Sequence, residues 1–236
     1  MHPFSARGER RGLLGLQLIF FLWNLIGALV FTVFTPLIML RSGNDTGVMG
    51  ASQAAFGIGG VVGGFVLSVW GGPKRKVDGV LLGMAGSGIF GLTFLGVAQN
   101  PILWMIGAFL TMVWVPLSNG SNQSIWQSKV PPRMQGRVFG TRAFIATIST
   151  PLSMAIARPL VDGFMTPSMM SGGFLVDSFG WLVGTGPGAE IGLLFVLVGL
   201  AVTVVSLCGY TVRAVREVEK TIPDHDCIQE ESSDEA

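Results

Sequence analysis

Six long apolar stretches divide this 236-residue chain, and basic residues collect in every second gap between them. Each stretch reaches the roughly 20 apolar residues that span about 30 Å of hydrocarbon as a helix. A helix of that length in a soluble protein would carry a polar face, and these stretches have none. The sequence therefore predicts an all-α membrane protein whose six transmembrane helices form one bundle, with a soluble all-α protein as the alternative. The predicted spans are 13–40, 49–71, 79–98, 102–128, 138–160 and 191–212.

The basic residues also lie before the first predicted span and after the last. The remaining gaps carry acidic residues or no charge, with Arg41 and Arg158 at their edges. Because Lys and Arg are enriched in cytoplasmic loops, this pattern predicts that both chain ends lie in the cytoplasm. The basic groups are Arg7, Arg10 and Arg11; Lys74, Arg75 and Lys76; Lys129, Arg133 and Arg137; and Arg213, Arg216 and Lys220.

The composition fits a membrane protein and argues against an enzyme. Half of the residues are hydrophobic and only 12% are charged. The two histidines, His2 and His225, lie in the terminal segments, and the sequence contains no HExxH, GxSxG or P-loop motif. We therefore expect no catalytic residues, cofactor, metal ion or nucleic-acid partner. The expected segments are a cytoplasmic N-terminal segment (1–12), the transmembrane domain (13–212) and an acidic, disordered cytoplasmic tail (213–236).

Small residues recur at a spacing of four in the second and third spans. This spacing lets helix backbones approach closely in lipid, and it also suits helices that slide or rock. Proline occurs inside three spans, where each ring removes a backbone hydrogen bond and permits a bend. The packing candidates are Gly59, Gly60, Gly63, Gly64, Gly79, Gly83 and Gly91, and the hinge candidates are Pro36, Pro116 and Pro151.

Few polar residues lie at membrane depth, so each is a candidate functional residue. Gln17 and Asn24, seven residues apart, share one face of the first span. A polar and aromatic stripe at positions i, i+3, i+4 and i+7 follows one face of the fourth span. These faces predict either a cavity for an amphipathic substrate or hydrogen bonds between helices. The residues of the stripe are Asn119, Asn122, Gln123 and Trp126.

The fifth span carries charged residues near both of its ends. Arg142 lies one turn inside the span, where its side chain can snorkel to the cytoplasmic surface or form a structural ion pair. Arg158 and Asp162 are four residues apart at the outer end and are expected to pair as a local brace. The segment 164–189 that follows is expected to be an external loop with a short interfacial helix.

Three motifs occur in order along the chain. Residues 64–76 read GFVLSVWGGPKRK, residues 130–140 read VPPRMQGRVFG, and a Pro-Leu pair at 151–152 precedes RPLVD at 158–162. Together these motifs resemble the C-terminal half, helices seven to twelve, of a major facilitator superfamily transporter. Within the superfamily they are most similar to the efflux branch that includes macrolide and siderophore exporters.

The resemblance implies a transport role for one bundle of a two-bundle protein. The first and fourth spans would line the substrate cavity, and the second and fifth would border the other bundle. The implied activity is secondary-active, proton-coupled efflux (antiport) of lipophilic or amphipathic small molecules across the plasma membrane by alternating access. The implied partners are the lipid bilayer, a small-molecule substrate and a second six-helix bundle. The loop residues that would close the cytoplasmic face and set orientation are Gly64, Gly71, Lys74, Arg75, Lys76, Gln135, Gly136 and Arg137.

The chain departs from the superfamily pattern in three respects. Ser68 stands where the full cytoplasmic signature has an acid, so an acid–arginine latch is not carried over. No carboxylate lies at mid-span, so a proton carrier would belong to the other half. That half is missing, and Met1 falls where the central loop would lie. A fragment, a truncated or split gene and a dimerising half-transporter therefore stay open, as do a non-transporting scaffold or remnant and an oligomeric pore.

Overall fold

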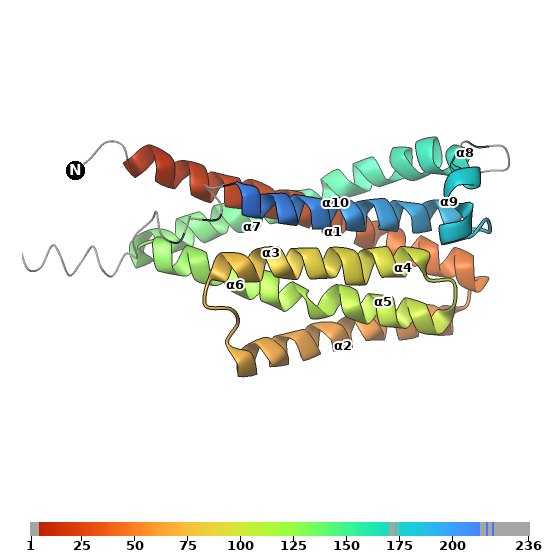
Figure 1. The fold of residues 1–236 in the computed structure, drawn as a ribbon, viewed down its shortest axis with the longest axis horizontal. Helices are drawn as coiled ribbons and strands as arrows, with labels where there is room; N and C mark the ends of the chain where they lie inside the picture. The colour runs from red at the N-terminus through yellow and green to blue at the C-terminus, as the bar shows by residue number, and fades with distance from the viewer. Residues whose placement is uncertain (1–4, 170–172, 174, 213–215, 217–218, 220–236) are drawn as a thin grey trace, which may run out of the picture.

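The computed structural model describes residues 5–169, 173, 175–212, 216 and 219 of the chain. These residues contain no β-strand, and six helical segments among them are long and apolar enough to cross a membrane. The segments pack side by side and alternate in direction, so that α1 begins and α10 ends at the same end of the bundle (Figure 1). The predicted six-helix all-α membrane fold is confirmed. The segments are Gln17–Ser42, Thr46–Trp70, Lys76–Val97, Pro101–Lys129, Pro132–Met169 and Ala189–Thr211.

Three of the crossings, the third, fourth and fifth, consist of more than one helical element. The helices of the first half are α1 (Ser5–Ser42), α2 (Thr46–Trp70), α3 (Lys76–Gly86), the π-helical turn η1 (Ser87–Thr93) and α4 (Phe94–Val97). Those of the second half are α5 (Pro101–Val113), α6 (Val115–Lys129), α7 (Pro132–Leu160), the π-helical turn η2 (Val161–Met165), α8 (Thr166–Met169), α9 (Val176–Val183) and α10 (Ala189–Thr211). The predicted tail, 213–236, lies outside the described residues except for Arg216 and Glu219.

The helices of two crossings differ in detail from the predicted spans, and the local chemistry explains both differences. The fifth crossing continues through η2 and α8 to Met169 and does not end at residue 160. Arg158 and Asp162 interrupt the apolar pattern there, but both are exposed and four residues apart, which a continuing helix accommodates. The fourth crossing is divided at Trp114 into α5 and α6. Pro116, at the start of α6, has no backbone N–H to donate to the preceding turn.

Side-chain and glycine caps fix the ends of the crossings. Asp45 caps α2, because its carboxylate accepts hydrogen bonds from the backbone N–H groups of Gly47 (2.8 Å) and Val48 (3.1 Å). Asn100 caps α5 by accepting from the N–H of Leu103 at 2.9 Å. Such caps stabilise a helix by about 1 kcal/mol each. Gly71 ends α2 in the left-handed conformation, with φ of 77°, and turns the chain into the basic loop.

Five of the seven glycines expected to pack lie against another helix, and two do not. A Cβ at Gly59 or Gly63 would meet the backbone of α5 at Phe109 and Val113, so α2 and α5 approach closely. Gly60 and Gly64 face away, with no atom of another segment within 4 Å of a built Cβ. Of these four glycines, Gly59 and Gly63 therefore form the face of α2 that packs against α5, which we call the α2 seam. The other packed positions are Gly79 and Gly83 against α6 and Gly91 against Thr111 of α5.

Hydroxyl groups add polar contacts between helices. Ser153 of α7 donates to the carbonyl oxygen of Leu25 in α1 at 2.7 Å. Ser118 of α6 donates to the carbonyl oxygen of Val80 in α3 at 3.1 Å. Interhelical hydrogen bonds in membranes contribute about 0.6–1 kcal/mol each. These contacts therefore fix the position of one helix along its neighbour more than they determine the stability of the bundle. They hold α1 against α7 and α3 against α6, which positions the helices that surround the candidate site.

Candidate functional site

A hollow of about 300 Å³ opens between α1, α6 and α7. Four of its lining side chains are polar, and the others are apolar or aromatic. We call it the Arg142 hollow. Its lining residues are Gln17, Phe20, Phe21, Asn24, Gln123, Phe139, Arg142, Ala143, Ile145 and Ala146.

Arg142 is half-buried beside this hollow and points toward α1 and α6. Its Nε donates a hydrogen bond to Gln17 Oε1 at 3.1 Å. Its guanidinium carbon lies 4.5 Å from the centre of the Trp126 ring and 5.7 Å from that of Phe139. These are cation–π distances, and they show that the side chain packs inside the bundle. No ion pair of Arg142 occurs among the described residues, and its contacts are an amide and two aromatic rings.

A second hollow, of about 250 Å³, adjoins the first at Asn24 and Ala146. We call it the central hollow. Its walls are mostly apolar, and Asn119 of α6 and Asn24 of α1 supply amide groups. The Nδ2 of Asn24 donates to the carbonyl oxygen of Phe20 at 2.8 Å. The further lining residues are Trp23, Gly27, Ala28, Val30, Phe31, Ser87, Leu92, Thr111, Met112, Val115 and Thr150.

The polar stripe expected on the fourth span divides between two faces of α6. Asn119 and Gln123 are exposed and line the central and Arg142 hollows, respectively. Asn122 and Trp126 are 2% and 8% exposed, and neither lines a hollow. Asn122 Oδ1 and Trp126 Nε1 have no hydrogen-bond partner in the described part of the chain. The structure thus brings Gln17, Asn24, Asn119 and Gln123 to the hollows and places the other two stripe residues in the packed interior.

The hinge candidates differ in what surrounds them. Helices α1 and α7 continue through Pro36 and Pro151 without a break. Pro116 lies two residues after Trp114, where α5 gives way to α6. Gly83 of α3 packs against this break, where a Cβ would lie 3.0 Å from the carbonyl oxygen of Trp114. The interruption therefore lies beside the central hollow, whose walls include residues of both α5 and α6.

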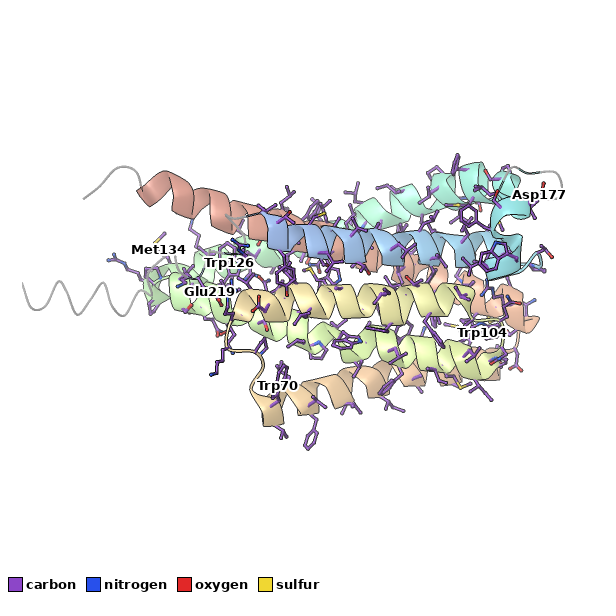
Figure 2. The ribbon with its side chains drawn as sticks, in the orientation of Figure 1. Trp70, Trp104, Trp126, Met134, Asp177 and Glu219 are labelled. Carbon is purple, nitrogen blue, oxygen red and sulfur yellow. The ribbon has the colours of Figure 1, made fainter. Side chains whose placement is uncertain are left out.

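The loops rich in Lys and Arg gather at one end of the bundle, which we call the basic end. Figure 2 places Trp126, Met134 and Glu219 at this end and Trp104 and Asp177 at the opposite end. Gln135 donates to the carbonyl oxygen of Val130 at 3.0 Å and to that of Gln127 at 3.3 Å, which caps the end of α6. Lys74, Arg75, Gly136 and Arg137 are exposed, and so is Ser68 in the last turn of α2.

Glu219 connects two of the basic loops. Its carboxylate accepts from the backbone N–H of Lys76 at 2.7 Å, and its carbonyl oxygen accepts from Lys129 Nζ at 3.0 Å. Arg75 donates to the carbonyl oxygen of Arg216 at 2.7 Å. The chain just beyond α10 therefore contacts both the α2–α3 loop and the end of α6.

The opposite end contains the residue that sequence reasoning missed. Arg41, expected at the edge of a loop, donates to the carbonyl oxygens of Gly96 (3.2 Å), Ala98 and Val183 (3.0 Å). It thereby ties α1 to the ends of α4 and α9. No sequence signal marks this role, because its acceptors are backbone carbonyls far away in the chain. Arg158 and Asp162 also lie toward this end and pair at 3.5 Å on the exposed surface.

The comparisons with known proteins agree with this architecture at a coarse level. No family model matches the chain, and no solved structure matches it. Over 157 residues it is 23% identical to macrolide efflux protein A of Streptococcus pyogenes, and it matches the protein of that name from serotype M6 to the same extent. The chain resembles an efflux transporter. The similarity covers 65% of this chain and 38% of the length of these relatives.

Proposed function

We propose that this chain forms one six-helix half of a major facilitator superfamily efflux transporter. Its activity is secondary-active, proton-coupled export of lipophilic or amphipathic small molecules by alternating access between two bundles. The observation that carries the proposal is the pair of adjoining hollows lined by amides of α1 and α6. These are the two crossings to which the superfamily resemblance assigns the substrate cavity.

The exposed faces of α2 and α7 support a second bundle as partner. Gly57, Gly60 and Gly64 of α2 have no atom of another segment within 4 Å of a built Cβ, and the same holds for Gly136 and Gly140 of α7. Small residues at helix surfaces allow close approach of another helix in lipid. A bundle provided by a longer form of this protein, by a separate chain or by a second copy would cover both faces and enclose the hollows.

The distribution of charge supports the orientation and the source of the coupling proton. Among the described residues, the basic end carries Lys74, Arg75 and Lys76 around one loop and Lys129, Arg133 and Arg137 around another, and it would face the cytoplasm of a plasma membrane. No carboxylate of the described residues lines either hollow, and the one inside a crossing, Asp162, is exposed and paired with Arg158 toward the end opposite the basic end. A proton-carrying carboxylate at membrane depth would therefore come from the second bundle.

The test is drug efflux from cells that co-express this chain with a six-helix partner. Efflux should appear only with both bundles present, and Asn119→Leu should abolish it at unchanged protein level. Gln127→Leu is the matched control, since Gln127 is an exposed amide of the same helix that lines neither hollow. Equal efflux by the Asn119 variant and wild type, or no efflux with any partner or second copy, would contradict the proposal.

A further inference from the structure

We propose that the two hollows bind an amphipathic anion, with its negatively charged head at Arg142 and its apolar body in the central hollow. This inference rests on the proposed function and specifies the chemical class of its substrate. It follows from the contacts of Arg142, from a comparison with Arg41 and from the arrangement of the two hollows.

The first observation is that the contacts of Arg142 leave its charge uncompensated. A guanidinium carries five N–H donors, and among the described residues its hydrogen bond goes to the neutral amide of Gln17. Its other contacts are the aromatic rings of Trp126 and Phe139. A cation at membrane depth is unfavourable unless it meets an anion, acceptor oxygens or water. The unused donors border the hollow, where a carboxylate, phosphate or sulfonate could accept from them in pairs.

Arg41 shows how this fold satisfies an arginine that has a structural role. Its guanidinium donates to three backbone carbonyls, those of Gly96, Ala98 and Val183. These acceptors belong to two segments, the end of α4 and the end of α9, and hold the side chain in one place. Arg142 has no such set of carbonyls around it in the described part of the chain, and it faces a hollow of about 300 Å³. The contrast indicates that Arg142 is arranged to receive an acceptor from outside the protein.

The two hollows follow one another along α1. Gln17 lines the Arg142 hollow, Asn24 lies at the junction and Phe31 lines the central hollow. At 1.5 Å per residue, the lining residues of α1 extend over about 20 Å. Both hollows are lined mostly by apolar side chains, and the charged one, Arg142, lies at the end of the path toward the basic end. The polar groups of the deeper central hollow are uncharged amides and hydroxyls. A molecule with an anionic head and an elongated apolar body matches the position of this charge and the direction of the path.

The experiment measures binding to the purified full chain in phosphatidylcholine nanodiscs. The probe is a dansyl-labelled medium-chain fatty acid, with a dansyl-labelled quaternary amine and a dansyl-labelled alcohol of the same chain length for comparison. Wild type should bind the carboxylate more tightly than the amine. Arg142→Gln should weaken carboxylate binding about tenfold to a hundredfold, and Arg142→Lys should retain part of the affinity. Arg158→Gln, which removes an exposed arginine of the same crossing, should bind the carboxylate like wild type.

Unchanged binding of the neutral alcohol shows that the Arg142 variants are folded. Ala146→Phe, which fills the junction of the hollows, should weaken all three probes. Nanodiscs containing phosphatidylglycerol then identify the source of the anion. If this lipid displaces the fatty acid from wild type but not from Arg142→Gln, the natural head group is that of a lipid. If it does not compete, the ligand is a soluble amphiphile.

Equal carboxylate affinity in wild type and Arg142→Gln, or a wild-type preference for the amine, would overturn the inference. These outcomes are separable from failure of the proposed function. If wild type binds the carboxylate but shows no efflux with any partner bundle or second copy, the transporter proposal alone is contradicted. Intact efflux of neutral compounds without carboxylate binding would contradict the anion proposal alone.

Discussion

Adding one methyl group to the packed or the open face of α2 should change stability in opposite directions. The packed position is Gly63 and the open position is its neighbour Gly64. A Cβ at Gly63 would lie 2.9 Å from the carbonyl carbon of Val113 and 3.1 Å from its Cα. A Cβ at Gly64 would have no atom of another segment within 4 Å. The two substitutions have the same chemistry, so only the direction of the side chain differs.

The magnitude follows from the distance between α2 and α5. The Cβ would come closest to the carbonyl oxygen of Val113, and carbon atoms in contact prefer about 3.5–4.0 Å, so Gly63→Ala must move the helices apart by about 1 Å. A gap of that size forfeits a quarter to a half of the dispersion energy of the contacts that line the seam. Overpacking lowers the free energy of unfolding by about 1–3 kcal/mol, and replacing Gly by Ala in a helix raises it by about 0.5–1 kcal/mol. We expect Gly63→Ala to lower the free energy of unfolding by about 1–2 kcal/mol, and Gly64→Ala to raise it by about 0.5–1 kcal/mol.

The assay is equilibrium unfolding of the isolated chain in mixed micelles with increasing dodecyl sulfate. Gly59→Ala, which meets the backbone of Phe109, should behave like Gly63→Ala, and Gly60→Ala should behave like Gly64→Ala. Equal shifts for the packed and open pairs would show that α2 does not use this face against α5. A larger loss at Gly64 than at Gly63 would show that the helix is rotated from the position described here.

Three further predictions test the ends of the bundle. Reporter fusions should read cytoplasmic after Lys76, Arg133 and Lys220 and external after Asp45 and Ser178, and an external signal at any of the first three would contradict the orientation. Arg41→Met should destabilise the chain by about 2–3 kcal/mol in thermal unfolding, because it removes three hydrogen bonds to backbone carbonyls, of which that of Ala98 keeps Trp104 Nε1 as a second donor. Arg158→Met should change stability by less than about 1 kcal/mol. Replacing Lys74, Arg75 and Lys76 together by Gln should reduce membrane insertion or efflux rate while the order of substrate preference stays the same, and a changed preference at normal expression would show that this loop contacts substrate.

Hydropathy and loop charge predicted the fold class because the bilayer imposes a length and an internally hydrogen-bonded backbone on each crossing. The sequence did not predict the rotation of each helix about its axis, and therefore not which of its faces packs. Glycines at a spacing of four mark both Gly59/Gly63 and Gly60/Gly64, and only the position of α5 selects the first pair. Likewise, Asn119 and Asn122 belong to one broad stripe in sequence, but α6 turns the first toward the hollow and the second into the interior.

The contacts of Arg41 and Arg142 depend on residues far away in the chain. Arg41 bonds to carbonyl groups, which every residue carries, so its buried role leaves no trace in local composition. Arg142 meets Gln17, which is 125 residues away. Its position one turn inside the predicted span indicated a site of interest but not the direction of its side chain. Long-range packing therefore determines which of the few polar residues reach the hollows.

The most direct test of the half-transporter account counts the six-helix bundles in liposomes that transport. Single-molecule photobleaching of labelled chains would be combined with efflux of a lipophilic fluorescent probe, driven by a pH gradient, in the same liposomes. Alternating access needs two bundles around one site, so transport should occur only where this chain is present with a partner bundle or with a second copy. Transport by liposomes that contain a single copy and no partner would contradict the account.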